Sequence, residues 1–139
     1  MSESANCIFC KIVRGEIPAI TVHEDEYTLA FMDIQPASTG HTLVICKAHA
    51  PSLLEIADVD LLAVAASTQQ VARAVQKALT PDGIRISQFN GAAAGQTVFH
   101  YHVHIIPVWE GQKIGSHGRA LANAEELKAL AARIREVLG

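Results

Sequence analysis

The strongest constraint on this chain is a run of nine residues, 99–107, in which three histidines occupy every second position of an otherwise apolar segment. They are His100, His102 and His104. Because a β-strand turns alternate side chains to the same face, the three imidazoles are expected to line one face of a sheet. A buried polar side chain without a hydrogen-bond partner costs about 1–3 kcal/mol, so packing alone gives no reason for three in a row.

Two kinds of chemistry suit such a set of histidines. Neutral histidine is the commonest metal ligand, and it is also a nucleophile or an acid–base group with a pKa near neutrality. A metal site built from His-x-His on a strand needs a further carboxylate or histidine, and no residue at the expected spacing forces that choice. The histidines by themselves therefore leave both interpretations open.

The segment before the histidines, residues 90–97, is a loop of small residues with the sequence Asn-Gly-Ala-Ala-Ala-Gly-Gln-Thr. Its two glycines let the backbone approach a ligand closely, and the side chains of Gln96 and Thr97 can bond phosphate oxygens. The order of loop and strand predicts an anion-binding loop that leads directly into the histidine strand.

Length and composition predict one domain, residues 1–139, with residues 1–5 as a loose tail. Hydrophobic residues make up 50% of the chain, enough for a core, and the formal net charge of −3 argues against a nucleic-acid-binding surface. Neither a signal-like stretch nor a membrane span is expected, so the expected location is the cytoplasm. Three cysteines suit reduced thiols or a metal better than a disulfide framework.

Apolar periodicity predicts five strands and two helices, with a hairpin turn at residues 24–26. One long helix is expected from Asp58, as its capping residue, to Leu79, and a second from Asn123 to Leu138, with Glu126 completing a capping box. Strands and helices do not alternate regularly, so the fold class is α+β, with an antiparallel sheet of about five strands, a long central helix and a C-terminal helix. The strands are expected at residues 20–23, 27–32, 42–45, 84–90 and 101–107.

Several further segments accompany the histidine run in a fixed order. They are residues 7–13 (CIFCKIV), 15–18 (GEIP), 30–36 (AFMDIQP), 40–45 (GHTLVI) and 95–99 (GQTVF). Together they resemble the histidine triad (HIT) family of nucleotide-binding hydrolases and transferases, over most of the chain from Cys7 to Trp109. The resemblance implies the HIT fold and a homodimer that joins two sheets. The Cys-x-x-Cys start looks most like the small bacterial proteins grouped with the nucleoside phosphoramidase branch.

The resemblance also implies catalytic roles. His102 matches the histidine that attacks the phosphorus bonded to the nucleoside, which forms a nucleotidyl-histidine intermediate, and the carbonyl of His100 matches the group that orients its ring. His104 matches a phosphate ligand near the scissile bond, and Thr97 stands where a hydroxyl can relay a proton to the leaving group. Gln96, Thr97 and His104 are the expected donors to the phosphoryl oxygens.

A nucleotide-binding set follows from the same resemblance. Asp33 matches a carboxylate that accepts from the ribose hydroxyls, with a turn residue before Pro36 as the alternative. Asn90 matches a sugar or phosphate contact, with an asparagine at a strand end as the alternative. The side chains expected to wall the base are Ile8, Phe9, Phe31 and Ile34.

Other residues are not assigned to the catalytic site. His23, His41 and His117 are explained adequately as surface or turn residues, and Cys46 as a strand end without a role. Trp109 and residues 110–118 follow the triad, and this region is expected to contact the leaving group.

Cys7 and Cys10 have a spacing that can hold one tetrahedral zinc ion. The resemblance to zinc-binding bacterial members completes the set with His49 and His100, which leaves His102 and His104 for chemistry. The alternatives are reduced thiols in a helical turn or a redox pair. No organic cofactor is expected.

These residues predict a purine nucleoside phosphoramidase that cleaves a P–N bond and releases AMP. Hydrolysis of dinucleoside polyphosphates, such as diadenosine tri- and tetraphosphate, stays open because the chain ends in the helix 123–138, where relatives of the phosphoramidase branch often carry a tryptophan-bearing tail. A third hypothesis is a nucleotide-binding protein that acts chiefly through a partner protein. A fourth is a metal-dependent enzyme that uses the triad as ligands.

Overall fold

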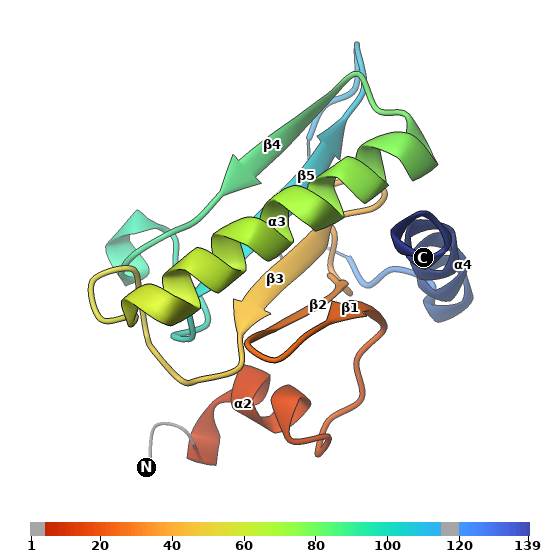
Figure 1. Cartoon of the computed structure of the whole chain (residues 1–139). Helices are drawn as coiled ribbons and strands as arrows, with labels where there is room; N and C mark the ends of the chain where they lie inside the picture. Colours follow the sequence, from red (N-terminus) through yellow and green to blue (C-terminus); the bar gives the residue numbers. More distant parts are fainter. Residues whose placement is uncertain (1–4, 115–119) are drawn as a thin grey trace.

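The computed structural model describes residues 5–114 and 120–139, which form one five-stranded antiparallel sheet with helices on both faces (Figure 1). The strand order is β1-β2-β3-β5-β4. In chain order the elements are α2 (Ile8–Val13), β1 (Thr21–Glu24), β2 (Thr28–Met32), β3 (Thr42–Cys46), α3 (Asp58–Leu79), β4 (Gly83–Ser87), the 3₁₀ turn η1 (Ala92–Ala94), β5 (His102–Val108) and α4 (Ala124–Leu138).

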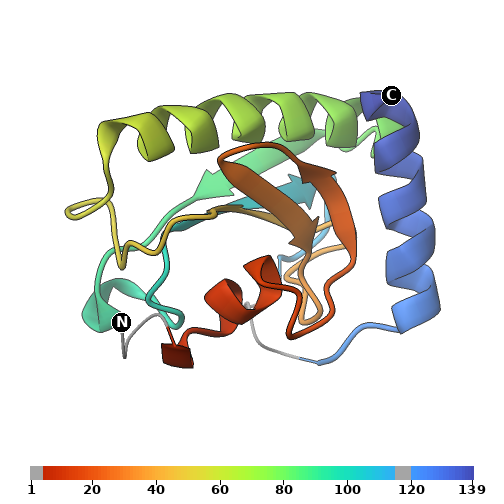
Figure 2. The same ribbon diagram turned by 60° about the horizontal axis from the view of Figure 1, so that its bottom comes forward.

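The sheet divides the apolar interior into two layers. Helices α3 and α4 cover one face and the short helix α2 covers the other, as Figure 2 shows. Val44, Val71 and Ile105 belong to the larger core beneath α3 and α4, and Phe9 and Phe31 to the smaller core beneath α2. Strands β2 and β3 are buried along their whole length because both of their faces are covered.

The structure confirms the α+β class, the five strands and the two long helices. The strand limits differ by one to three residues. The last strand begins at His102 because the N–H of Tyr101 donates to the carbonyl of Ala50 at 2.7 Å, outside the sheet. The fourth strand ends at Ser87, before residue 90, and the side chains of Gln88 and Asn90 bond each other beyond it.

The long helix α3 has the predicted bounds, but the predicted cap is wrong. Ala57 occupies the N-cap position, with no side-chain cap bond, and Asp58 lies in the first turn. A carboxylate there still interacts favourably with the positive end of the helix dipole. In α4 the side chain of Asn123 accepts from the N–H of Glu126 at 3.1 Å, which is the Asn123 half of the predicted capping box.

The β1–β2 hairpin turns at the predicted residues around Asp25. Its Oδ1 accepts from the N–H groups of Tyr27 (3.0 Å) and Thr28 (2.9 Å), and its Oδ2 accepts from the Ser67 hydroxyl of α3 (3.0 Å). Burial raises the pKa of Asp25, but hydrogen bonds from Thr28, His23 and the backbone outweigh it and hold the pKa below its usual range. His23, expected as a surface or turn residue, lies in β1 opposite Ala30 and is half-buried.

No helix in residues 5–114 and 120–139 combines the length and the apolar character needed to cross a membrane. Of the tail expected at residues 1–5, residues 1–4 lie outside the described residues.

Candidate functional site

The histidine run places His102 and His104 on β5, which pairs with β3 on one side and with the edge strand β4 on the other. Alternation along the strand turns Val103 and Ile105 toward the core beneath α3, and the histidines toward α2. The ring centroids of His102 and His104 lie 5.0 Å apart, and the ring of Phe9 lies 5.1 Å from His102 and 5.8 Å from His100. All three histidines are buried, which agrees with the predicted common face.

One backbone carbonyl fixes the tautomer of His102. Its Nδ1 lies 2.6 Å from the carbonyl oxygen of His100, as the resemblance implied. A carbonyl oxygen can only accept, so Nδ1 carries the proton and donates. The ring lone pair therefore lies on Nε2, which makes Nε2 the nucleophilic atom.

His104 is oriented by His41, a residue that the sequence reasoning left out of the site. The N–H of Ala37 donates to Nδ1 of His41 at 3.0 Å, so the proton of the His41 ring is on Nε2. That Nε2 lies 3.0 Å from Nδ1 of His104 and donates to it. His104 in turn carries its proton on Nε2, where it can donate to an anion.

The prediction that His41 is a surface or turn residue is wrong. Its side chain is fully buried, because it precedes β3 and β3 pairs with β5, which brings it against His104. Asp33 Oδ2 lies 3.5 Å from His41 Nε2, so a carboxylate faces the polarised N–H. The Gly-His pair at residues 40–41, inside a matching family segment, was the available signal.

The five residues expected around the nucleoside line a single pocket of about 200 Å³. Asp33 is the acidic residue among its described lining residues, and its side chain is only 4% exposed. Asp33 Oδ1 also accepts from the N–H of Gln35 at 2.8 Å, so the turn role weighed as its alternative is present too. The five residues are Ile8, Phe9, Phe31, Asp33 and Ile34, and we call this cavity the apolar pocket.

The glycine loop is held by two of the side chains that were expected to contact the nucleotide. The amide of Gln96 donates to the carbonyls of Pro51 (2.6 Å) and Val98 (3.0 Å), and its oxygen accepts from the N–H of Gly91 (2.8 Å). Asn90 Oδ1 accepts from the N–H of Leu53 at 2.8 Å. The structure thus gives Gln96 and Asn90 bracing roles in the loop, whereas Thr97 is exposed at its end.

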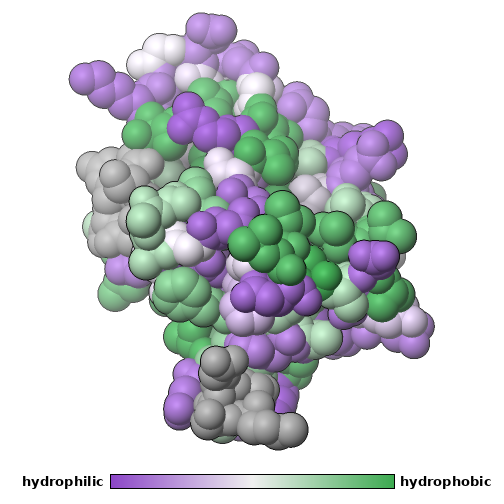
Figure 3. Space-filling view, turned by 90° about the vertical axis from the view of Figure 1, so that its left-hand side faces the viewer, coloured by the Kyte–Doolittle hydropathy of each residue, from purple (hydrophilic) through white to green (hydrophobic). Residues whose placement is uncertain are grey.

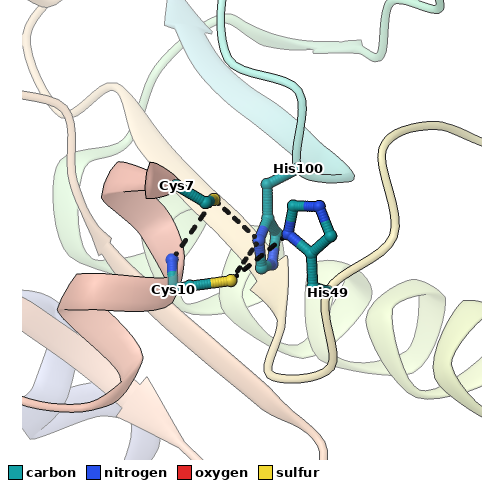
Figure 4. A group of neighbouring side chains, drawn as sticks. All are labelled: Cys7, Cys10, His49 and His100. Carbon is teal, nitrogen blue, oxygen red and sulfur yellow. Dashed lines mark hydrogen bonds between the residues drawn. The ribbon is translucent and has the colours of Figure 1, made fainter. Parts of the chain in front are cut away.

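A second group of side chains, which we call the Cys/His cluster, joins three separated segments (Figure 4). Cys10 Sγ lies 3.2 Å from Nδ1 of His49 and 3.5 Å from Nδ1 of His100, and Cys7 Sγ lies 3.3 Å from the same atom of His100. The two cysteines lie at the start of α2. The sequence predicted no longer helix there, and a helical turn was considered only as an alternative to the metal site. The four residues are the predicted metal ligands Cys7, Cys10, His49 and His100.

The geometry of the Cys/His cluster fits a tetrahedral metal ion. One ligand atom from each residue lies within 4.8 Å of the others. Zn–S and Zn–N bonds of about 2.3 and 2.0 Å at a tetrahedral angle separate sulfur and nitrogen by about 3.5 Å, close to the three S–N distances of the cluster. Zinc bound there would tie α2 to the loop after β3 and to the segment before β5.

His100 is prepared as a ligand by the backbone of Cys46. Its Nε2 donates to the Cys46 carbonyl at 2.6 Å, which turns the lone pair of Nδ1 toward the two thiols. Burial lowers the pKa of His100 to about 4, so its ring is neutral at pH 7. Cys46 is a strand end, as predicted, but it does have a role, through its carbonyl.

The segment after β5 begins at the end of that strand away from His102. The N–H of Glu110 donates to Asp82 Oδ2 at 2.7 Å, beside the start of β4. Gly83 pairs there with Val108, at the opposite end of β5 from His102. The expected contact of this region with the leaving group therefore stays a prediction. Residues 115–118, including His117, lie outside the described residues.

A histidine held as a nucleophile, a second histidine held as a donor and an apolar pocket beside them define a site for phosphoryl or nucleotidyl transfer. The family pattern described as the HIT domain matches residues 14–111. The chain therefore belongs to the HIT family, whose members are generally nucleotide hydrolases or transferases.

Individual relatives agree with this assignment. A crystal structure of a HIT-like protein involved in cell-cycle regulation from Bartonella henselae, with an unknown ligand, has 44% identity and a TM-score of 0.91, and the match covers 95% of this chain and 96% of that one. A zinc-bound family member from Mycobacterium smegmatis has 38% identity and a TM-score of 0.85, with coverage of 97% and 94%. An adenylylsulfatase of Arabidopsis thaliana is 38% identical over 84% of this chain and 62% of its own length.

Proposed function

We propose that this protein hydrolyses purine nucleoside phosphoramidates, breaking the P–N bond and releasing AMP and an amine. The observation that carries the proposal is the fixed pair of imidazoles, with the His102 lone pair on Nε2 and the His104 proton on Nε2. Phe9 links this pair to the apolar pocket, because its ring contacts His102 and also lines that pocket. A base in the pocket would bring its phosphate toward the two histidines.

In the first step His102 Nε2 attacks the α-phosphorus and forms a P–N bond to the imidazole. The bond to the leaving nitrogen breaks, and its electron pair stays on that nitrogen, which takes up a proton supplied from solvent through the Thr97 hydroxyl. The Nε2–H of His104 donates to a phosphoryl oxygen on which negative charge grows. Such preorganised donors lower a barrier by several kcal/mol.

In the second step water attacks the same phosphorus and releases AMP. A P–O bond forms, the bond to His102 Nε2 breaks, and its electron pair returns to the imidazole. One proton of the water goes back to solvent, which balances the proton taken up by the amine. The His100 carbonyl supports both steps, because it stabilises the positive charge that develops on the His102 ring.

We propose zinc as the ion of the Cys/His cluster, in a structural role. The zinc-bound relative and the fit of the four ligand atoms support it. The ion would supply no step of the reaction, and the cluster's effect on chemistry would pass through His100, whose carbonyl holds His102.

Hydrolysis of dinucleoside polyphosphates is the second candidate function. The observation that favours it is that the same pair of imidazoles can attack, and donate to, an α-phosphate whose leaving group is a further phosphate. The adenylylsulfatase among the relatives is named for the hydrolysis of another adenylyl compound, which is consistent with either candidate.

The experiment that tests the proposed function compares AMP release from an adenosine phosphoramidate with release from diadenosine tri- and tetraphosphate at one enzyme concentration. We expect the phosphoramidate to give the highest kcat/KM. Faster polyphosphate cleavage would move the protein to the second candidate. The absence of turnover on all three would favour a nucleotide-binding protein that acts through a partner.

We also propose that two copies of the chain form a homodimer. In the described sheet β4 is an edge strand, and apolar side chains are exposed on and beside β4 and on the first half of α3, namely Val59, Leu62, Ile86 and Phe89. Figure 3 shows apolar side chains gathered between polar ones on the side of the molecule that lies at the left in Figure 1. Light scattering at micromolar concentration is expected to give twice the chain mass, and a monomer mass would contradict the proposal.

A further inference from the structure

A second and larger pocket, of about 660 Å³, opens on the other side of the start of α2. It shares Ile8 and Val98 with the apolar pocket, so the two cavities adjoin across these side chains. Thr97, the hydroxyl assigned to the leaving group, also lines it. A substrate whose nucleoside fills the apolar pocket therefore has room for its leaving group in this second cavity, which we call the Glu55 pocket.

The walls of the Glu55 pocket combine apolar surface with one charged group. Ile8 is 46% exposed and Phe99 is 49% exposed, so both offer apolar contact area. Glu55 is the carboxylate among the described lining residues, and the Ser52 hydroxyl donates to its Oε1. Since that bond engages one oxygen, the carboxylate is positioned at the wall and retains acceptor capacity.

The charge of the Glu55 pocket is negative. None of the described residues that line it is a lysine or an arginine. The adjoining Cys/His cluster does not reverse the sign, because two thiolates would cancel the charge of a divalent ion held there with two neutral imidazoles. The second nucleotide of a dinucleoside polyphosphate would bring phosphates next to Glu55, with no lysine or arginine among the described lining residues to meet them, which costs energy.

We propose that the Glu55 pocket is the leaving-group subsite and that it selects amines with an apolar body and a second, positively charged end. The inference rests on the proposed function and narrows it to phosphoramidates of cationic amines. The apolar body packs against Ile8, Val98 and Phe99, and the distant ammonium pairs with the Glu55 carboxylate. The bonds made and broken are those of the two steps above, and the distant ammonium keeps its proton throughout.

The test compares two adenosine phosphoramidates that differ in one charge, one made from hexylamine and one from the matching hexane diamine. In the wild type we expect kcat/KM for the diamine substrate to exceed that for the hexylamine substrate about three- to fivefold, the range of a solvent-accessible ion pair. Glu55→Gln is expected to bring this ratio to about one, and Glu55→Lys to invert it. Each ratio is taken within one variant, so partial loss of folded protein does not affect it.

Glu26→Gln is the matched control, because Glu26 is exposed in the β1–β2 turn and lines neither pocket. It should keep the wild-type ratio. Equal kcat/KM for the two substrates in the wild type, or an unchanged ratio in Glu55→Gln, would overturn the inference while the proposed function stands. If neither substrate releases AMP, the proposed function is wrong. The subsite is then tested by calorimetry, and the ratio of the affinities for the diamine and hexylamine compounds within each variant replaces the ratio of kcat/KM.

Discussion

Replacement of His102 by alanine is expected to lower kcat for AMP release from an adenosine phosphoramidate by about a thousandfold or more. The variant loses the nitrogen that attacks phosphorus, and water at the same position is a far weaker nucleophile. The environment of the ring should survive, since the His100 carbonyl that it bonds can accept from water. Steady-state AMP release measures the loss of turnover. Rapid-quench detection of an acid-labile nucleotidyl-protein measures the loss of the covalent intermediate.

Two histidine variants serve as comparisons for His102→Ala. His23→Ala removes an imidazole in the β1–β2 hairpin and should leave kcat within about twofold of the wild type, because His23 bonds Asp25 in β1, at the edge of the sheet away from β5. His41→Ala is expected to lower kcat by about 10–100-fold, since it acts through the orientation of His104. A His102→Ala protein that keeps its activity and its covalent intermediate would show that another group is the nucleophile.

Replacement of Cys10 by alanine is expected to remove bound zinc and to lower the free energy of unfolding by about 3–4 kcal/mol, the stabilisation from a ligand present at about 100–1,000 times its Kd. Cys10 contacts both histidines of the Cys/His cluster, so its loss leaves an incomplete ligand set. The protein is purified without a tag, zinc is measured by elemental analysis, and unfolding is followed in urea with and without a chelator.

Cys46→Ala is the matched control, because it also removes a buried thiol close to His100. It should keep one zinc per chain, since His100 is held by the backbone carbonyl of Cys46, which alanine retains. A chelator should destabilise the wild type and Cys46→Ala but not Cys10→Ala. A wild-type protein purified without zinc, or equal chelator sensitivity in all three proteins, would contradict the assignment.

Much of this fold follows from local sequence patterns. The 3.6-residue spacing of apolar side chains gives α3 its predicted bounds, because one face of the helix must be buried continuously along its length. The histidine alternation places His102 and His104 together, since a strand allows no other arrangement of residues two apart. The caps are predicted less well, as Ala57 shows, because a first turn can form without a side-chain cap when tertiary packing holds the helix.

The candidate site was predictable where spacing or family resemblance fixed it. The Cys-x-x-Cys spacing brings two thiols to the start of one helix, and the alternating histidines supply one further ligand of the cluster. Asn90 and Gln96 show the limit of this reasoning, because an amide suited to a phosphate is equally suited to backbone groups. Their amides bond to Leu53 and Pro51, in a loop that the sequence could not place beside them.

The sequence by itself determined the fold class, the face shared by the triad histidines and the residue types available for chemistry, since these depend on periodicity within single elements. Only the tertiary structure decided which group holds each imidazole. His41 reaches His104 across 63 positions, and the Cys46 carbonyl reaches His100 across 54. Such partners depend on the register of β3 against β5 and on the loops at their ends, where side chains far apart in the chain are forced to satisfy one another's hydrogen bonds.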